Sequence, residues 1–204
     1  MARRILVVMI PRRRALVLGL ALGVLALFLP AAAQEDPAWG LLRAGTQVIL
    51  IRHAATDMSQ RDQGGVPLSD CSRQRNLTDA GRADARKIRE AFRLRAIPVG
   101  RVLSSPYCRC LDTARLAFGE PTPWLPLQSS ESDPVLQAER TAEIHRIAAT
   151  VPTGGNLVLV THQFTIRAVT GVDVAEGEML VLSPHGDGTF EILGRMAPDD
   201  LPVP

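Results

Sequence analysis

The sequence predicts an α/β domain, a three-layer α/β/α sandwich in which helices cover both faces of a mainly parallel central sheet. Continuous apolar runs rich in β-branched residues are typical of strands buried on both faces. Amphipathic helical segments alternate with these runs, the order expected when parallel strands are joined by helices. The length of 204 residues fits one domain behind an N-terminal leader.

The expected elements follow one another with few interruptions. Strands are predicted at 46–51, 101–103 and 157–160, and a terminal hairpin at 178–182 and 189–194. Helices are predicted at 78–94 with Thr78 as N-cap, at about 106–118 with Pro106 in the first turn, at about 135–150, and in a short segment ending near 170. Residues 34–45 are expected to be a polar lead-in, and 57–76 and 119–134 to be loops. Loops as long as 57–76 are usually functional.

Residues 1–33 have the pattern of a secretory signal peptide. Five arginines precede the aliphatic run 15–29, and Ala31–Ala33 supplies small residues for cleavage. We therefore expect a mature domain of residues 34–204 that is periplasmic or secreted and has no stable membrane span. The alternative is an uncleaved anchor, although Pro30 interrupts a stretch that is barely long enough to cross a bilayer.

The charge of the chain changes when this leader is removed. The precursor has 23 basic and 21 acidic residues, and the leader contains five arginines and no acidic residue. The formal net charge therefore falls from +2 to −3. The mature domain gives no reason to expect nucleic acid as a partner.

The chain contains three cysteines, Cys71, Cys108 and Cys110. In an exported protein an odd number suggests one disulfide and one spare thiol. Cys108 and Cys110 are too close in sequence to bridge comfortably, so Cys71 must be one partner. Of the two pairings that this leaves we favour Cys71–Cys108; three buried free thiols are the alternative. No His or further Cys lies at ligand spacing, so neither a metal nor another cofactor is expected.

Polar side chains follow three of the predicted strands. Arg52 and His53 follow the first, Ser104 and Ser105 the second with Arg109 early in the next helix, and His162 the third. In parallel α/β folds these strand ends meet at one edge, where ligands bind. Arginines bind phosphoryl oxygens bidentately, and a neutral imidazole is a nucleophile. The sequence therefore predicts a phosphate site.

Four segments carry a resemblance to a known family. "RHAAT" (52–56) resembles an RHGET-type signature, "NLTDAGRADA" (76–85) an L-T-x-x-G helix start, "VLSSPYCRCLDTA" (102–114) an S-S-x-x-x-R segment, and "LVLVTHQFTIRAVTG" (157–171) a second-histidine strand. These are features of the histidine phosphatase superfamily, which has the phosphoglycerate-mutase-like fold. They cover roughly residues 46 to 171 in the expected order.

The resemblance implies a phosphoric monoester hydrolase of the histidine acid phosphatase type. His53 would accept the phosphoryl group, water would hydrolyse the phosphohistidine, and Arg52, Arg109 and His162 would bind the phosphoryl oxygens. Thr56, Arg75, Ser104 and Ser105 would be further phosphate or substrate contacts. For Arg75 a surface position is an alternative, and for Ser104 a helix-capping role.

The resemblance leaves the general acid open. Mutase-type members carry a glutamate in an insertion that is here a short proline-rich loop. Glu131 and Asp57 are the candidates, with Asp133 and Asp62 as alternatives. A basic alkoxide needs a proton to leave, whereas an acidic leaving group needs little help.

Two other functions remain open. A pseudo-enzyme would bind phosphorylated envelope glycans or lipids without cleaving them, and a mutase would transfer the phosphoryl group. In all cases the partner is a small phosphorylated substrate or a phosphorylated envelope component.

Overall fold

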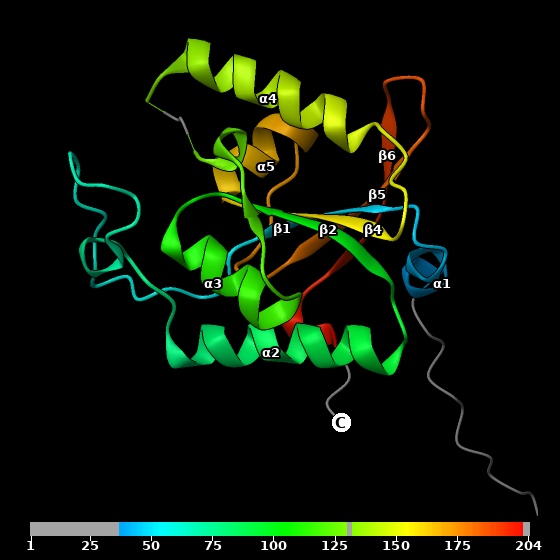
Figure 1. Cartoon of the computed structure of the whole chain (residues 1–204), viewed down its shortest axis with the longest axis horizontal. Coiled ribbons are helices and arrows are strands. Elements are labelled where there is room, and N and C mark those ends of the chain that lie inside the picture. Colours follow the sequence, from blue (N-terminus) through cyan, green and yellow to red (C-terminus); the bar gives the residue numbers. More distant parts are fainter. Residues whose placement is uncertain (1–36, 130–131, 202–204) are drawn as a thin grey trace, which may run out of the picture. The chain divides into compact units, whose positions relative to one another are not determined.

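The computed structural model describes residues 37–129 and 132–201, in which six strands form one mixed sheet (Figure 1). The strands are β1 (Val48–Arg52), β2 (Val99–Ser104), β3 (Thr122–Pro123), β4 (Asn156–Thr161), β5 (Met179–Pro184) and β6 (Phe190–Met196). Their order is β3-β2-β4-β1-β5-β6. The pairs β2–β3, β2–β4 and β1–β4 are parallel, and β5 and β6 continue the sheet antiparallel to their neighbours.

Helices cover both faces of this sheet. They are α1 (Pro37–Arg43), α2 (Asp79–Leu94), α3 (Cys108–Ala117), α4 (Pro134–Ala148) and α5 (Gln163–Thr170), with 3₁₀ turns at Cys71–Arg73, Leu125–Leu127 and Pro198–Asp200. Figure 1 shows α4 and α5 on one face and α2 and α3 on the other. The predicted three-layer α/β/α class is confirmed.

Alternate residues of the central strands form two separate cores. Ile49 and Ile51 of β1 pack in the core that includes α1, α2 and α3, whereas Val48 and Leu50 pack in the core that includes α4 and α5. All four side chains are fully buried. This double burial explains why the strand reads as a continuous apolar run.

The N-terminus of α2 lies where it was predicted. The Oγ1 of Thr78 accepts a hydrogen bond from the N–H of Gly81 at 3.0 Å, which is an N-cap contact. The predicted start of the next helix is wrong, because α3 begins at Cys108 and Pro106 precedes it. The N–H of Cys108 donates to the side-chain Oε1 of Gln74 at 2.9 Å. A residue distant in sequence therefore caps this helix, and local sequence could not show it.

Two segments predicted to be irregular contain regular structure. The lead-in 34–45 includes α1, whose Trp39 is buried and packs edge-on against Phe92 with ring centroids 5.6 Å apart. The loop 119–134 includes the two-residue edge strand β3, which pairs with β2. Both elements depend on contacts with distant parts of the chain, so short local patterns did not predict them.

The predicted signal peptide, residues 1–33, lies outside the described residues. In the part of the chain that the structure describes, no helix has the length and hydrophobicity needed to cross a bilayer.

Candidate active site

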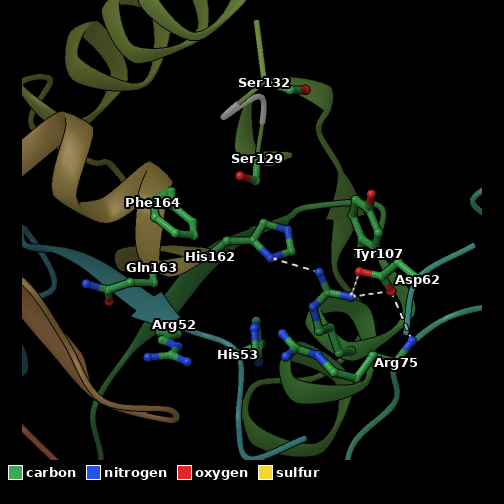
Figure 2. A pocket seen from close by; sticks show the side chains of 11 residues that line it. Arg52, His53, Asp62, Arg75, Tyr107, Ser129, Ser132, His162, Gln163 and Phe164 are labelled. Carbon is green, nitrogen blue, oxygen red and sulfur yellow. Dashed lines mark hydrogen bonds and ion pairs between the residues drawn. The ribbon is translucent and has the colours of Figure 1, made fainter. Parts of the chain in front are cut away.

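The polar residues that follow β1, β2 and β4 meet at one pocket of about 620 Å³. Figure 2 shows the side chains that line it. They are Arg52, His53, Asp62, Arg75, Tyr107, Arg109, Ser129, Ser132, His162, Gln163 and Phe164. The four side chains predicted from the strand ends, two imidazoles and two guanidiniums, are therefore brought together.

Backbone and ring contacts both fix the position of His53. Its N–H donates to the carbonyl of Thr161 at 2.9 Å, and its carbonyl accepts from the N–H of Gly177 at 3.0 Å. The ring Nδ1 lies 2.9 Å from the carbonyl oxygen of Ala54. Because a carbonyl only accepts, Nδ1 carries the proton, and the lone pair of Nε2 is left for a nucleophilic attack.

The surroundings of His53 keep its ring uncharged. Burial lowers its pKa to about 3, and the positive charges of Arg109, Arg52 and Arg75 act in the same direction. The ring is 3% exposed. At neutral pH the imidazole is therefore unprotonated at one nitrogen, as a nucleophile must be.

The second histidine lies beside the first, with ring centroids 5.6 Å apart. Its Nε2 is 2.8 Å from the Oγ of Ser105, and its Nδ1 is 3.5 Å from the Nη2 of Arg109. Burial, followed by the charge of Arg109, lowers the pKa of His162 well below its ordinary value. Both histidines are thus neutral groups in a cationic pocket.

Arg109 is nearly buried, with 6% of its side chain exposed. Its Nη1 donates to both carboxylate oxygens of Asp62, at 2.9 and 3.1 Å. The guanidinium carbon lies 4.4 Å from the centre of the Tyr107 ring, which is cation–π distance. The pocket therefore holds this guanidinium in a fixed orientation, with an anionic group bound to it.

Arg52 is anchored by the loop between α5 and β5. Its Nη1 donates to the carbonyl of Val174 at 3.0 Å, and its Nη2 lies 3.6 Å from the Oε1 of Glu176. The same Oε1 accepts a hydrogen bond from Thr56 at 2.8 Å and lies 4.0 Å from Nδ1 of His53. Thr56, which was expected in the phosphate pocket, donates its hydroxyl to Glu176 and does not line the pocket.

The pocket has more hydrogen-bond donors than acceptors. Within residues 37–129 and 132–201, the Nε of Arg52, Arg75 and Arg109 is buried and has no hydrogen-bond partner. A buried donor without an acceptor is costly, so an oxygen-rich anion is the ligand that would best fit these side chains. Arg75 lines the pocket, as the phosphate-contact hypothesis required.

Three other predicted site residues lie elsewhere. Ser104 is buried and its hydroxyl donates to the carbonyl of Ser105, so Ser105 is the serine at the site. Asp57 accepts from the N–H and hydroxyl of Ser59 and does not line the pocket. Glu131 lies outside the described residues. The structure therefore does not place Ser104, expected as a phosphate contact, or Asp57, expected as the acid, among the residues that line the pocket.

The predicted disulfide Cys71–Cys108 is confirmed, with Cα atoms 5.7 Å apart. It ties the 57–76 loop to the first residue of α3, next to Arg109. Cys110 is free and buried, and its Sγ lies 3.6 Å from Nε2 of His162. Burial raises the pKa of this thiol to about 12, so it is not a nucleophile at neutral pH. In the described residues no three His, Cys, Asp or Glu side chains are grouped to hold a metal ion.

The comparison with family models agrees with this geometry. The model of the histidine phosphatase superfamily (branch 1) matches residues 48–132, which include β1 and the segment through α3. Over this segment the chain is similar to the histidine phosphatase superfamily. No curated protein matches the chain by sequence.

Solved structures with a similar fold cover most of the chain. The protein histidine phosphatase SixA complexed with tungstate has a TM-score of 0.54 at 14% identity, covering 76% of this chain and 99% of its own. The protein of the open reading frame Rv3214 from Mycobacterium tuberculosis has a TM-score of 0.54 at 20% identity, and the match covers 72% of this chain and 95% of that protein. Mycobacterial glucosyl-3-phosphoglycerate phosphatase in complex with VO3 has a TM-score of 0.53 at 17% identity, and the match covers 72% of this chain and 96% of that protein. At these identities the likeness concerns the fold alone.

Several residues of the site were not predicted from the sequence. Tyr107 lies inside the quoted 102–114 motif, and Gln163 and Phe164 directly follow the second histidine, so position alone would have suggested them. Glu176 has no such signal, because its loop precedes an ordinary strand. Its role emerges only when the fold brings it to Thr56 and Arg52.

Proposed function

We propose that this chain is an exported, metal-independent phosphatase that hydrolyses a phosphomonoester through a phosphohistidine on His53. The main observation in support of this proposal is the hydrogen bond from Nδ1 of His53 to the carbonyl of Ala54. It leaves Nε2 as the attacking nitrogen in a pocket lined by Arg52, Arg75 and Arg109. A neutral nucleophile among guanidiniums suits an anionic electrophile.

The reaction has two steps. Nε2 attacks phosphorus, the P–N bond forms, and the bond to the leaving oxygen breaks. Water then attacks phosphorus, the P–N bond breaks, and inorganic phosphate is released. In both steps Arg52 and Arg109 stabilise the negative charge on the non-bridging oxygens, which is the main need in phosphoryl transfer.

His162 has a donor role in this scheme. A guanidinium can only donate, so Nδ1 of His162 is the acceptor from Arg109 in the structure, and Nε2–H donates to Ser105. When a phosphoryl group binds Arg109, the other tautomer becomes favourable. The hydroxyl of Ser105 then donates to Nε2, and Nδ1–H donates to a phosphoryl oxygen.

The location is proposed from two independent features. Residues 1–33 have the pattern of a signal peptide. The disulfide Cys71–Cys108 supports an oxidising compartment, because such bonds are rare in the cytosol. We therefore place the mature protein in the periplasm or outside the cell.

The substrate is a small phosphorylated molecule or a phosphorylated envelope component. The pocket volume of about 620 Å³ lies within the ordinary range for small-molecule sites. Names of similar structures include a protein histidine phosphatase and a glucosyl-3-phosphoglycerate phosphatase, so the fold serves leaving groups of different chemistry.

The test is phosphate release from para-nitrophenyl phosphate by the mature protein, together with trapping of radiolabelled phosphate on the enzyme. We expect His53→Ala to abolish both, and His185→Ala, at an exposed histidine after β5, to retain both. Turnover by His53→Ala would overturn the proposal. Binding of vanadate without labelling or turnover would favour the pseudo-enzyme, and transfer to an acceptor without phosphate release would favour the mutase.

A further inference from the structure

The proposed reaction lacks a group that protonates the leaving oxygen. An alkoxide leaves with difficulty unless a general acid protonates it, a contribution of roughly 10²- to 10⁴-fold in rate. Among the described residues that line the pocket, Asp62 is the one carboxyl. The two histidines are engaged as nucleophile and oxygen donor, and the arginines do not release protons.

The position of Asp62 is defined by two different contacts. Its carboxylate accepts from Nη1 of Arg109 at 2.9 and 3.1 Å, and its Oδ1 also accepts from the backbone N–H of Arg75 at 2.9 Å. The Asp62 side chain is 35% exposed, so it borders both the pocket and solvent. Figure 2 shows Asp62 and His53 on different sides of the pocket.

These contacts respond differently to a substrate. The phosphoryl group needs the guanidinium of Arg109, so it takes the place of the carboxylate there. The backbone N–H of Arg75 stays available and keeps Asp62 at the pocket wall. Asp62 then lies beside the bound phosphoryl group without its guanidinium partner.

We propose, on the basis of the proposed function, that Asp62 is the general acid and base of this phosphatase. In the first step the phosphorus–oxygen bond breaks as Nε2 of His53 attacks from the opposite side, and the Asp62 proton passes to the leaving oxygen. In the second step the Asp62 carboxylate takes a proton from the attacking water while the P–N bond breaks. The carboxyl is restored, and no other reactant is needed.

The fold provides a reason why a loop residue can serve this purpose. The 57–76 loop that carries Asp62 is joined to α3 by Cys71–Cys108 and by the contact of Gln74 with the N–H of Cys108. Arg109 follows directly on α3. The acid and its guanidinium partner are thus on two segments that are covalently connected beside the pocket.

The experiment compares two substrates that differ by one methylene, para-nitrophenyl phosphate and para-nitrobenzyl phosphate. The phenolate leaves without a proton, whereas the benzyl alkoxide needs one. We expect Asp62→Asn to lower kcat/KM for the benzyl ester by about 10²-fold or more, with a much smaller change for the phenyl ester. Both esters carry the same phosphate group, so a change in phosphate affinity cancels in the ratio of the two kcat/KM values. The value of kcat/KM reports the steps up to formation of the phosphohistidine, so the later hydrolysis of this intermediate does not affect the ratio.

The matched control is Asp70→Asn, the same substitution in the same loop. Asp70 accepts from Ser72 and does not line the pocket, so the ratio should stay at the wild-type value. An unchanged ratio in Asp62→Asn, or an equal loss for both esters, would overturn the assignment. The assignment would also be overturned if Glu131→Gln, and not Asp62→Asn, selectively lowered kcat/KM for the benzyl ester. If the wild type hydrolysed neither ester, the proposed function itself would fail.

Discussion

The hydroxyl of Ser105 lies 2.8 Å from Nε2 of His162, although 57 residues separate them in the sequence. A hydroxyl both donates and accepts, so Ser105 can pair with either tautomer of this imidazole. Only the tautomer that accepts from Ser105 has a proton on Nδ1, the nitrogen that lies near Arg109. Ser105 therefore determines whether His162 is able to donate to a phosphoryl oxygen.

Ser105→Ala should lower kcat/KM for para-nitrophenyl phosphate by about fivefold, since one lost hydrogen bond is worth about 1 kcal/mol. Ser104→Ala is the control, because that hydroxyl donates to a backbone carbonyl and does not contact His162. Comparable losses in the two variants would contradict a specific role for Ser105.

The sequence predicts the layers of the fold well because the strong signals are local. Continuous apolar strands and the Thr78 cap depend on neighbouring residues, and each is found where expected. Elements that depend on distant contacts are missed. The segment 37–43 is helical with Trp39 packed against Phe92, and the start of α3 is capped by Gln74.

The site likewise contains residues that the sequence predicts and residues that it does not. Residues at strand ends, His53, Arg109 and His162 among them, are gathered because parallel strands end at a common edge. Side-chain direction is less predictable. Ser104 and Ser105 are neighbours in the sequence, yet only Ser105 contacts the second histidine. Glu176 could not be foreseen, because its partners come from another part of the sheet.

Gly81 allows the first turn of α2 to approach the strand-end segment. A Cβ at this position would lie 2.1 Å from the carbonyl oxygen of Ala55. Gly81→Ala should therefore lower the free energy of unfolding by about 2 kcal/mol or more, as overpacking usually does. Urea unfolding followed by circular dichroism measures this change.

Gly40→Ala is the matched control, because Gly40 is also helical but a Cβ there meets nothing within 4 Å. This variant should gain about 0.5 to 1 kcal/mol from the lower backbone entropy of the unfolded chain. A similar effect of both substitutions would show that the close approach at Ala55 does not limit stability.

The disulfide should stabilise both the domain and the pocket. Cys71 and Cys108 are 37 residues apart, and opening the bridge releases the 57–76 loop, which carries Asp62 and Arg75, from the start of α3. The double substitution Cys71→Ala/Cys108→Ala should lower the free energy of unfolding by about 2 to 4 kcal/mol. Reductant should lower the stability of the wild type and leave the double variant unchanged; sensitivity of the double variant would point to another cause.

The buried histidines should make the protein less stable in acid. Burial lowers the pKa of His53 from 6.5 to about 3 in the folded state, so between these values the unfolded chain binds more protons than the folded one. Stability must then fall as the pH is lowered from about 6.5 towards 3. The full effect of this one group is on the order of 5 kcal/mol, at about 1.36 kcal/mol per pKa unit.

Comparing wild type with His53→Gln isolates this contribution, because carboxyl groups titrate in both proteins and glutamine does not. We expect the free energy of unfolding, measured in urea at several pH values from neutral to acid, to fall less steeply in His53→Gln. Part of the slope should remain, since burial lowers the pKa of His162 in the same direction. Parallel curves for the two proteins would mean that His53 is protonated in the folded state at mildly acidic pH, and an imidazolium cannot be the attacking nucleophile.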